Sequence, residues 1–376
     1  MKKFDAAIAG AGLIGGSIAL ELARAGLRVG LFDRQEPGQE SSWAGAGILS
    51  PAPESAAMIP LVSLAKASMA IYPDFVRMVE EMSGQSAGYR PKGTLQAIFS
   101  GHAREELSTV VALHHGLGLK AEALSAADAR ELEPSLSDDL EAAVLRPDEA
   151  SVDNRAMTQA VLEAARRSGV QFFPGSGAEA ICREGDRCAG LQLKNEKIEA
   201  QWTVIAAGCF SANIEGAAPY APVRPAKGQM VSLRSGDLKI ERVLWSEKIY
   251  LVPRNDGRIL AGATVEYVGF ERGLTAGGLE KVLAGAIELS PGLAAARVEE
   301  TWAGLRPDSP DHLPILGPTD VDGLLIATGH FRGGILLAPI TAQLVREWVT
   351  LQNVSVNWDR FSPMRFHSTT AHRAPA

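Results

Sequence analysis

The chain has 376 residues, of which 46% are hydrophobic and 22% charged, a composition typical of a soluble globular protein with room for two domains. A net charge of -7 without a concentrated basic run argues against a nucleic-acid surface and favours a small partner. Cys182, Cys188 and Cys209 lack CxxC and zinc-finger spacing, so we expect reduced thiols, no metal site and a cytoplasmic protein. Because no uninterrupted apolar run reaches the ~20 residues that span a bilayer, we expect no membrane partner.

The first fifty residues predict a nucleotide-binding unit. Residues 4–10 (FDAAIAG) form an apolar run, and residues 12–25 repeat apolar side chains at helical spacing, which indicates strand, turn and helix. The turn carries three glycines in a GxGxxG pattern: one permits the turn, one lets a pyrophosphate approach the backbone, and one lets helix pack on strand. The free N–H groups of the helix N-terminus would bind the phosphates. These glycines are Gly10, Gly12 and Gly15.

The next strand, 28–32, ends in Asp33, ~20 residues beyond the motif, where a carboxylate can accept hydrogen bonds from ribose hydroxyls. An ordinary βαβ turn is the alternative. Residues 41–48 (SSWAGAGI) argue against it, because they form a small-residue loop where a nicotinamide enzyme would normally start a second helix. Hydroxyls and bare backbone at this point suit a bulky flat ring.

The middle of the chain predicts mixed elements. Helices are expected at 61–82, 102–116, 125–132 and 155–168, and strands at 93–100, 143–146, 170–173, 178–182 and 188–193. Adjacent His114 and His115 point about 100° apart on a predicted surface helix, so they cannot share a metal as an i, i+4 pair can, and we expect them to be solvated. The apolar strand 202–208 ends in Gly208, a second point where a parallel sheet meets the cofactor.

From residue 223 the pattern becomes antiparallel, with strands at 229–233, 249–253 and 258–265 and a hairpin turn at 255–257. A helix at 275–289 and a strand at 298–304 follow, and the strand 323–328, the turn 329–334 and a helix to about 349 return the chain to the first sheet. We therefore predict an α/β fold with a discontinuous cofactor domain (1–82, 142–221 and 312–362). The substrate domain comprises 83–141 and 222–311, and 363–376 form a loose tail.

Two residues are candidates for substrate binding. Arg306 ends a strand between Gly304 and Pro307, and a guanidinium can bind a carboxylate through two parallel hydrogen bonds. Its alternative is a surface ion pair. Tyr250 could donate its hydroxyl to the same carboxylate, although a tyrosine in a strand is more often a core residue. The turn 329–334 would direct the positive end of a helix toward the ligand.

These motifs carry a family resemblance. GAGLIGGSIALELARAG, SSWAGAGILSP, YLVPR, WAGLRP and GHFRGGILLAP resemble, in order and spacing along nearly the whole chain, the glycine oxidase branch of the D-amino-acid oxidase family of flavoproteins. The resemblance implies a Rossmann-like FAD domain with an inserted antiparallel substrate domain. It places the substrate carboxylate on Tyr250 and Arg306, and Arg332 on the substrate side of the flavin. It further implies that FAD contacts Leu13, Ile14, Asp33, Arg34, Ser41, Ser42, Ala46, Gly47, Ile48, Ala178, His330, Phe331, Arg332, Gly333, Gly334, Ile335 and Leu336.

Some positions depart from that pattern. Ile48 and Val265 stand where glycine oxidases carry methionine, and Lys248 replaces a pocket histidine. By strand alternation Lys248 shares a face with Tyr250. It either faces substrate, shifting preference toward larger or acidic D-amino acids, or extends into water from the strand end. Relatives with covalent flavin use a cysteine near the WAGLRP region; because no cysteine follows Cys209 in this chain, we predict noncovalent FAD.

The activity that the resemblance implies is oxidation of glycine, sarcosine or small D-amino acids by hydride transfer from the α-carbon to flavin N5. The imine would then be hydrolysed, O2 would be reduced to H2O2, and the product could serve thiamine biosynthesis. The alternatives are a quinone-linked dehydrogenase, a nicotinamide-dependent dehydrogenase and a flavin-binding redox protein without turnover. The sequence leaves the oligomeric state open, including a homo-oligomer.

Overall fold

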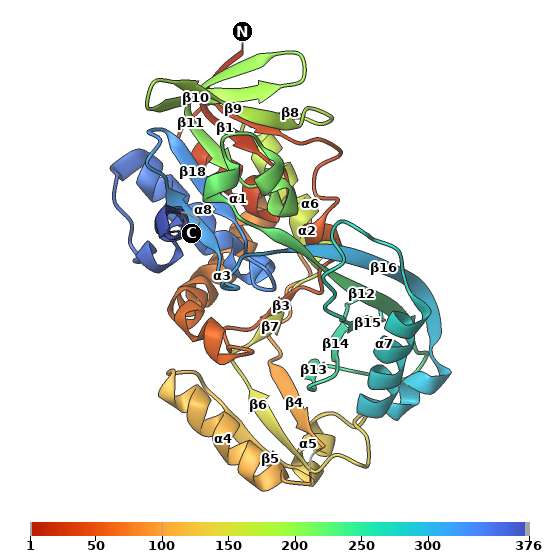
Figure 1. Cartoon of the computed structure of the whole chain (residues 1–376). Helices are drawn as coiled ribbons and strands as arrows, with labels where there is room; N and C mark the ends of the chain where they lie inside the picture. The colour runs from red at the N-terminus through yellow and green to blue at the C-terminus, as the bar shows by residue number, and fades with distance from the viewer. Residues whose placement is uncertain (1, 100, 373–376) are drawn as a thin grey trace.

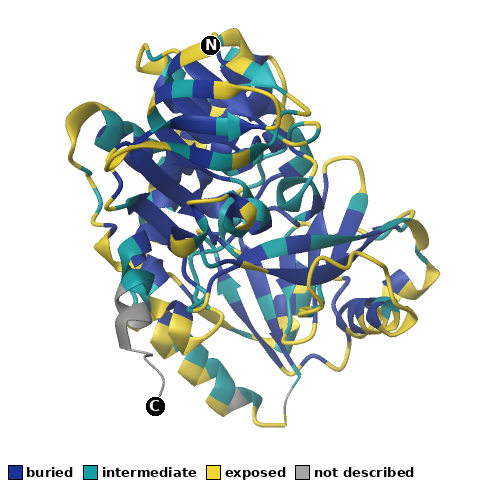
Figure 2. Ribbon diagram, turned by 45° about the horizontal axis from the view of Figure 1, so that its top comes forward, coloured by how far each residue is buried: buried dark blue, intermediate teal, exposed yellow. Residues whose placement is uncertain are grey.

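The computed structural model describes residues 2–99 and 101–372, which fold around two eight-stranded sheets (Figure 1). A short two-stranded pair, β3 (Ile48–Leu49) and β7 (Ala150–Ser151), lies between them. In Figure 2 the strands of both sheets are mostly buried, whereas exposed residues concentrate in loops and on outer helix faces. This arrangement confirms the predicted mixed α/β fold with a parallel and an antiparallel part.

The first sheet has the order β17-β18-β11-β1-β2-β8, with a β9–β10 hairpin attached to β11. The four neighbouring pairs from β18 to β8 are parallel, as apolar strands connected by helices predict. The pairs β17–β18, β10–β11 and β9–β10 are antiparallel. The strands are β1 (Lys2–Ala9), β2 (Val29–Phe32), β8 (Gln171–Phe173), β9 (Ala178–Glu184), β10 (Arg187–Leu193), β11 (Lys197–Ile205), β17 (Ile315–Pro318) and β18 (Leu324–Thr328).

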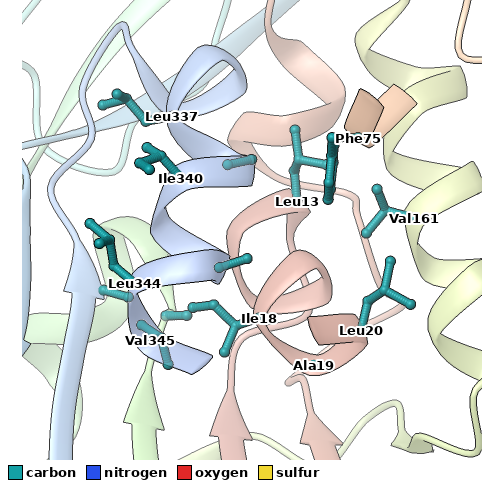
Figure 3. Packing of buried hydrophobic residues seen from close by; sticks show 14 of the residues in the cluster. Leu13, Ile18, Ala19, Leu20, Phe75, Val161, Leu337, Ile340, Leu344 and Val345 are labelled. Carbon is teal, nitrogen blue, oxygen red and sulfur yellow. The ribbon is translucent and has the colours of Figure 1, made fainter. Parts of the chain in front are cut away.

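Helices pack in a layer on one face of this sheet and bury a large apolar cluster. Figure 3 shows Leu13, Ile18 and Leu20 between side chains of neighbouring helices such as Val161 and Leu344. Asp153 caps the N-terminus of α6 by accepting hydrogen bonds from two backbone N–H groups. The helices are α1 (Leu13–Arg24), α3 (Val62–Ser83), α6 (Asn154–Arg167) and α8 (Gly334–Leu351), and the 3-10 turn η1 (Ala56–Leu61) precedes α3.

The second sheet has the order β16-β12-β15-β14-β13-β4-β6-β5 and is antiparallel except between β13 and β4. Helices α5 (Ala126–Leu132) and α7 (Ala276–Leu289) cover one face, and α4 (Ala103–Gly116) packs over β6 on the opposite face. The strands are β4 (Thr94–Ile98), β5 (Glu122–Ser125), β6 (Ala142–Arg146), β12 (Arg224–Arg234), β13 (Val243–Trp245), β14 (Tyr250–Pro253), β15 (Arg258–Gly262) and β16 (Arg297–Asp308).

The rest of the described regular structure consists of short helical segments. These are α2 (Ser41–Ala44), η2 (Gly208–Asn213), η3 (Ala218–Tyr220), η4 (Pro291–Ala295), η5 (Asp359–Phe361) and η6 (Pro363–His372). Ile214 and Tyr220, in and beside these turns, pack on the face of the first sheet opposite to α1. Both faces of that sheet are therefore buried.

Two expectations about the chain's division are corrected by the structure. Residues 142–146, assigned to the cofactor domain, form β6 and pair with β4 and β5 in the second sheet. A short apolar strand does not reveal which sheet it joins, because its partner lies about 50 residues away along the chain. The first residues of the expected loose tail, 363–376, pack against the rest of the protein. The Arg365 guanidinium pairs with the Asp311 carboxylate at 2.9 Å, and Met364 packs against the core of the first sheet.

The helical segment Ala56–Ser83 is, among the described residues, the one that is long and apolar enough to cross a membrane. Leu64, Tyr72 and Val79 of this segment are nevertheless fully buried, and α3 packs against α6 and α8. A core helix passes the same test of length and composition. We therefore interpret α3 as part of the protein core.

Candidate active site

A cavity of 1110 Å³ lies between the carboxyl ends of the first sheet and one face of the second. Ligands bind at this edge in open parallel sheets. One end of the cavity is lined by residues that follow β2 and β11, and the other by β4, β6 and α4. The cavity is large enough for a dinucleotide and a small substrate together.

Backbone shapes the end of the cavity next to β1. Gly10 has φ +107°, and a Cβ there would lie 2.4 Å from the Ala206 carbonyl oxygen. A Cβ on Gly15 would lie 1.8 Å from the Gly10 carbonyl oxygen, so helix and strand approach as the glycine pattern predicts. Gly12 caps α1 without a side chain, leaving the helix N-terminus open to the cavity. This cradle fits a pyrophosphate.

Asp33 and Arg34 follow β2 on the cavity wall. The Asp33 carboxylate accepts hydrogen bonds from the backbone N–H groups of Ala11 at 2.7 Å and Gln35 at 3.1 Å, and burial raises its pKa. The carboxylate therefore stabilises the glycine turn. Its hydrogen bond to a ribose hydroxyl stays a prediction. The Arg34 guanidinium pairs with Glu40 and lies 3.4 Å above the Phe210 ring centre. Two further predicted cofactor-binding residues, Ala178 and Gly208, also line the cavity.

A loop of the second half, residues 263–275, covers this same end. Its Phe270 ring stacks on Phe210 with 4.9 Å between ring centroids. Its Arg272 guanidinium binds the Glu40 carboxylate at 2.7 Å, beside the Arg34 pair. We name residues 263–275 the strap. It connects the two halves of the molecule next to the cofactor cavity.

The wall formed by residues 41–48 is held by hydrogen bonds from both halves of the molecule. The Ser42 hydroxyl accepts from the Leu13 N–H at 2.8 Å, and the Asn154 amide donates to the Ser42 carbonyl at 2.8 Å. Arg254 donates to the Ala46 carbonyl at 2.8 Å. The sequence analysis did not single out Asn154 or Arg254, because their partners are backbone atoms about 100 residues away or more. The predicted residues Ser41, Ala46, Gly47 and Ile48 all line the cavity.

The turn after β18 reaches the cavity as predicted. His330 is buried, its Nε2 lies 3.1 Å from the Thr341 hydroxyl, and burial lowers its pKa to about 3. It is therefore neutral and structural. Gly333 caps α8 without a side chain, so this helix N-terminus also faces the cavity. Phe331, Gly334, Ile335 and Leu336 complete the predicted wall.

Arg332 lies on the same wall and is paired with the Glu54 carboxylate. Burial lowers the pKa of its guanidinium. Glu54 follows the small-residue loop and also lines the cavity. Arg332 thus already has an anionic partner from this chain.

Arg306 and Tyr250 lie close together on the second sheet. The Arg306 guanidinium donates to the Thr264 carbonyl at 3.2 Å and occupies the space in which a Gly228 side chain would stand. The Tyr250 hydroxyl lies 3.4 Å from the Met230 sulfur. Burial raises the pKa of Tyr250, an effect that the neighbouring Arg306 opposes. The two side chains form a phenol and guanidinium pair suited to a carboxylate.

The structure places Lys248 outside this pair. Its ammonium binds the Glu288 carboxylate at 2.8 Å, and the side chain is 67% exposed at the cavity rim. Strand alternation does not extend to Lys248, because β14 begins at Tyr250 and Ser246 hydrogen-bonds the Ile249 carbonyl across a turn. Of the two readings, the geometry favours the one in which Lys248 extends into water. Val265 is also partly exposed, at 39%.

The expectation of two solvated histidines was wrong for one of them. His114 is buried on α4, its Nδ1 lies 2.7 Å from the Val110 carbonyl, and burial lowers its pKa. It lines the cavity together with Gln96 and Arg146, none of which the sequence analysis had proposed as site residues. In the described ranges 2–99 and 101–372, no three His, Cys, Asp or Glu side chains are placed to hold a metal.

Cys209 lies on the cavity wall and donates its thiol to the Leu305 carbonyl at 3.3 Å. Burial raises its pKa to about 12, which keeps the sulfur protonated near neutral pH. A protonated thiol is a poor nucleophile. This favours the noncovalent binding that we predict, although the thiol lies beside the WAGLRP segment in space.

Comparison with known proteins identifies the family. Residues 5–348 match the family described as FAD dependent oxidoreductase, to which this chain therefore belongs. The chain is 35% identical over 97% of its length to the bifunctional protein ThiO/ThiG of Synechocystis sp., of which it covers 54%. It is 33% identical over 90% of its length to glycine oxidase of Pseudomonas aeruginosa, of which it covers 93%. It thus spans about half the length of the bifunctional relatives.

The fold agrees with that assignment. The crystal structure of glycine oxidase from Geobacillus kaustophilus superposes with a TM-score of 0.92, at 30% identity, over 97% of this chain and 99% of that one. FAD is the cofactor of the family. The glycine cradle, the two helix N-termini whose cap residue is a glycine and the Asp33 carboxylate fit a dinucleotide, so the residues present fit FAD.

Proposed function

We propose that the chain is an amino-acid oxidase that converts glycine, sarcosine or a small D-amino acid to its imine. The observation that carries this proposal is the Arg306 and Tyr250 pair on the cavity wall that faces the nucleotide cradle. Water would hydrolyse the imine to a 2-oxo acid and ammonia, or methylamine in the case of sarcosine, and O2 would take up two electrons and two protons to give H2O2. The likeness to glycine oxidases and to ThiO supports this substrate class and a supply of imine to thiamine synthesis.

When bound, FAD supplies the two-electron acceptor for a hydride from the substrate α-carbon. The protein's part is to hold the substrate in reach. Arg306 would bind the α-carboxylate through two N–H groups, and Tyr250 would donate a third hydrogen bond. Trp302, whose indole N–H donates to the Ala44 carbonyl at 3.0 Å, packs the two halves together behind this site and excludes water.

The proposal also sets a pH dependence. A protonated amine cannot release hydride, so turnover should rise with pH until the bound amine is neutral. Because burial raises the pKa of Tyr250, its hydroxyl remains a donor throughout that range. The rise should therefore follow the pKa of the substrate amine.

The three free cysteines are consistent with the cytoplasmic location that we propose.

The test is a spectrum of the purified yellow protein, mixed anaerobically with glycine and then with D-alanine. Bleaching that reverses in air with formation of H2O2 is the expected result. Bleaching without recovery in air would instead indicate a quinone-linked dehydrogenase. A protein that remains oxidised with every amino acid tested would contradict the proposal.

A further inference from the structure

The Arg306 guanidinium is held by a backbone atom of the strap. It donates a hydrogen bond to the Thr264 carbonyl at 3.2 Å, and it lies where a Cβ on Gly228 would stand, so this glycine has no side chain to support it. A guanidinium has five N–H groups, so the bond to Thr264 leaves others for a substrate carboxylate. The direction in which Arg306 offers them therefore depends on where Thr264 is held.

Regular structure contributes little to the position of the strap. Beyond Gly262, where β15 ends, the strap is joined to β12 by an isolated bridge between Lys227 and Glu266, with backbone hydrogen bonds of 2.8 and 2.9 Å. In the sheet, β12 lies between β15 and β16, the strand that carries Arg306 (Figure 1). Residues 267–275 are exposed. An exposed segment of this kind opens easily unless specific side chains anchor it.

A buried ammonium ties the two legs of the strap together. The Lys227 side chain is only 2% exposed, and its Nζ atom lies 2.9 Å from the Glu266 carboxylate on the first leg. The same ammonium donates to the Gly273 carbonyl on the second leg at 3.0 Å. A charge buried this deeply is costly without its partners. Because both acceptors belong to the strap, displacement of the strap would leave the ammonium unpaired.

Glu266 connects this anchor to Thr264. Its second carboxylate oxygen accepts hydrogen bonds from the Thr264 hydroxyl at 2.5 Å and from the Gln229 amide at 2.8 Å. Gln229 is fully buried, and its backbone N–H donates to the same Thr264 hydroxyl at 3.1 Å. Burial would raise the pKa of Glu266, but hydrogen bonds from its three partners outweigh this effect and lower it, so the carboxylate is ionised near neutral pH. The Thr264 side chain is thus fixed by two hydrogen bonds.

We propose that Lys227 is a positioning residue for Arg306. Its ammonium fixes Glu266, Glu266 fixes the Thr264 hydroxyl, and the Thr264 carbonyl fixes the guanidinium that binds the substrate carboxylate. Arg306 is paired with Ala226 in the sheet, so Lys227, the next residue, points to the opposite face and does not line the cavity. This inference rests on the proposed function, because it requires a carboxylate on Arg306. It places a determinant of carboxylate affinity behind the strand, away from the reacting atoms.

The test uses the FAD-loaded protein with Lys227→Met, which keeps a side chain of similar length and removes its charge. We expect the dissociation constant of acetate, a carboxylate with no amine to oxidise, to increase ~5-fold or more when it is measured from the flavin spectrum, as the loss of one supporting hydrogen bond allows. The value of kcat/KM for glycine should fall by a similar factor, mostly through KM. Thr264→Val, which keeps the carbonyl and removes the hydroxyl, should act in the same direction, and it tests the proposal if Lys227→Met does not fold.

A double-mutant cycle separates positioning from general destabilisation. Because Lys227 acts through Arg306, Lys227→Met should change kcat/KM for glycine by less than about 2-fold when Arg306→Met is already present. The matched control is Arg242→Met, which removes the cation of another buried ion pair, with Glu133, outside the cavity. Arg242→Met should lower the free energy of unfolding but leave acetate binding unchanged.

The outcomes distinguish the positioning role from the proposed function. Equal acetate binding in the wild-type protein, Lys227→Met and Thr264→Val would overturn the positioning role, even if the protein oxidises glycine. An equal loss of kcat/KM with and without Arg306→Met would also overturn it, because Lys227 would then act by another path. Weaker acetate binding in both variants, with no oxidation of any amino acid, would contradict the proposed function alone.

Discussion

The two ends of the cavity are built in different ways. The cofactor end is mostly backbone: glycine turns and helix N-termini close together in sequence make its cradle. The substrate end consists of side chains that stand on one face of a sheet, from strands between residues 94 and 308. A backbone cradle tolerates few substitutions, because a Cβ at Gly10 or Gly15 would collide with a neighbouring carbonyl oxygen. A side-chain surface can change its ligand while the fold persists.

A substitution in the glycine turn of the cofactor end should have the largest effect. Gly10→Ala would place a Cβ 2.4 Å from the Ala206 carbonyl at a positive φ. We expect loss of bound FAD and a decrease of about 2–4 kcal/mol in the free energy of unfolding, from overpacking and backbone strain. Flavin absorbance and urea unfolding measure these effects.

The matched control for this substitution is Gly26→Ala. Gly26 also has a positive φ, +87°, but no atom lies within 4 Å of the added Cβ. The Gly26→Ala variant should lose only about 1 kcal/mol of unfolding free energy and keep its flavin. Equal flavin loss in both variants would show that strain, and not contact with the cradle, governs cofactor binding.

At the substrate end, Arg306→Met should leave the flavin bound and raise KM for glycine. Loss of two charge-assisted hydrogen bonds should lower kcat/KM by roughly 150-fold or more, because each contributes about 1.5–3 kcal/mol. Tyr250→Phe should lower it by only about 5-fold, since a neutral hydrogen bond contributes about 1 kcal/mol. Steady-state kinetics measures both. Loss of flavin from Arg306→Met would contradict the division between the two ends.

Acid should act on the cofactor end through His330. Its pKa of about 3 in the folded protein lies below the usual 6.5, so the unfolded state binds the proton more tightly. The contribution of neutral His330 to the free energy of unfolding is fully present above pH 6.5 and is lost as the pH falls toward 3. At pH 5 the loss should be about 2 kcal/mol. His330→Gln, which does not titrate, should flatten this part of the curve of unfolding free energy against pH; an unchanged slope would exclude His330 as its source.

The smallest effect is expected at the rim. Lys248→His should leave the kcat/KM ranking of glycine, D-alanine and D-aspartate unchanged, with changes of less than about 2-fold, because exposed ion pairs contribute about 0–1 kcal/mol. A reordered ranking would show that Lys248 reaches the substrate, and it would extend the specificity surface to the rim.

What the sequence could predict follows the same division. The glycine turn, Asp33 and the loop 41–48 are local patterns whose geometry depends on a few neighbouring residues. The structure places Tyr250 and Arg306, which were proposed as substrate-binding residues, on the cavity wall, and their binding role stays a prediction. Gln96 and Arg146 depend on the pairing of β4 with β6 and β13, which no local pattern specifies. His114 was misjudged although Leu107, Val110 and Val111, which lie seven, four and three residues before it on the same helix face, are apolar and pack on β6.

The chain crosses between the two sheets several times. The second sheet requires β4 to pair with β13, about 150 residues later, and the first sheet requires β11 to pair with β18, which ends at Thr328. During synthesis, therefore, neither sheet can be completed by the segments that leave the ribosome first. The cavity closes only when almost the whole chain has been made. Flavin acquisition is then one of the last events in the life of the nascent protein, and a chain interrupted before residue 328 would lack a site to receive it.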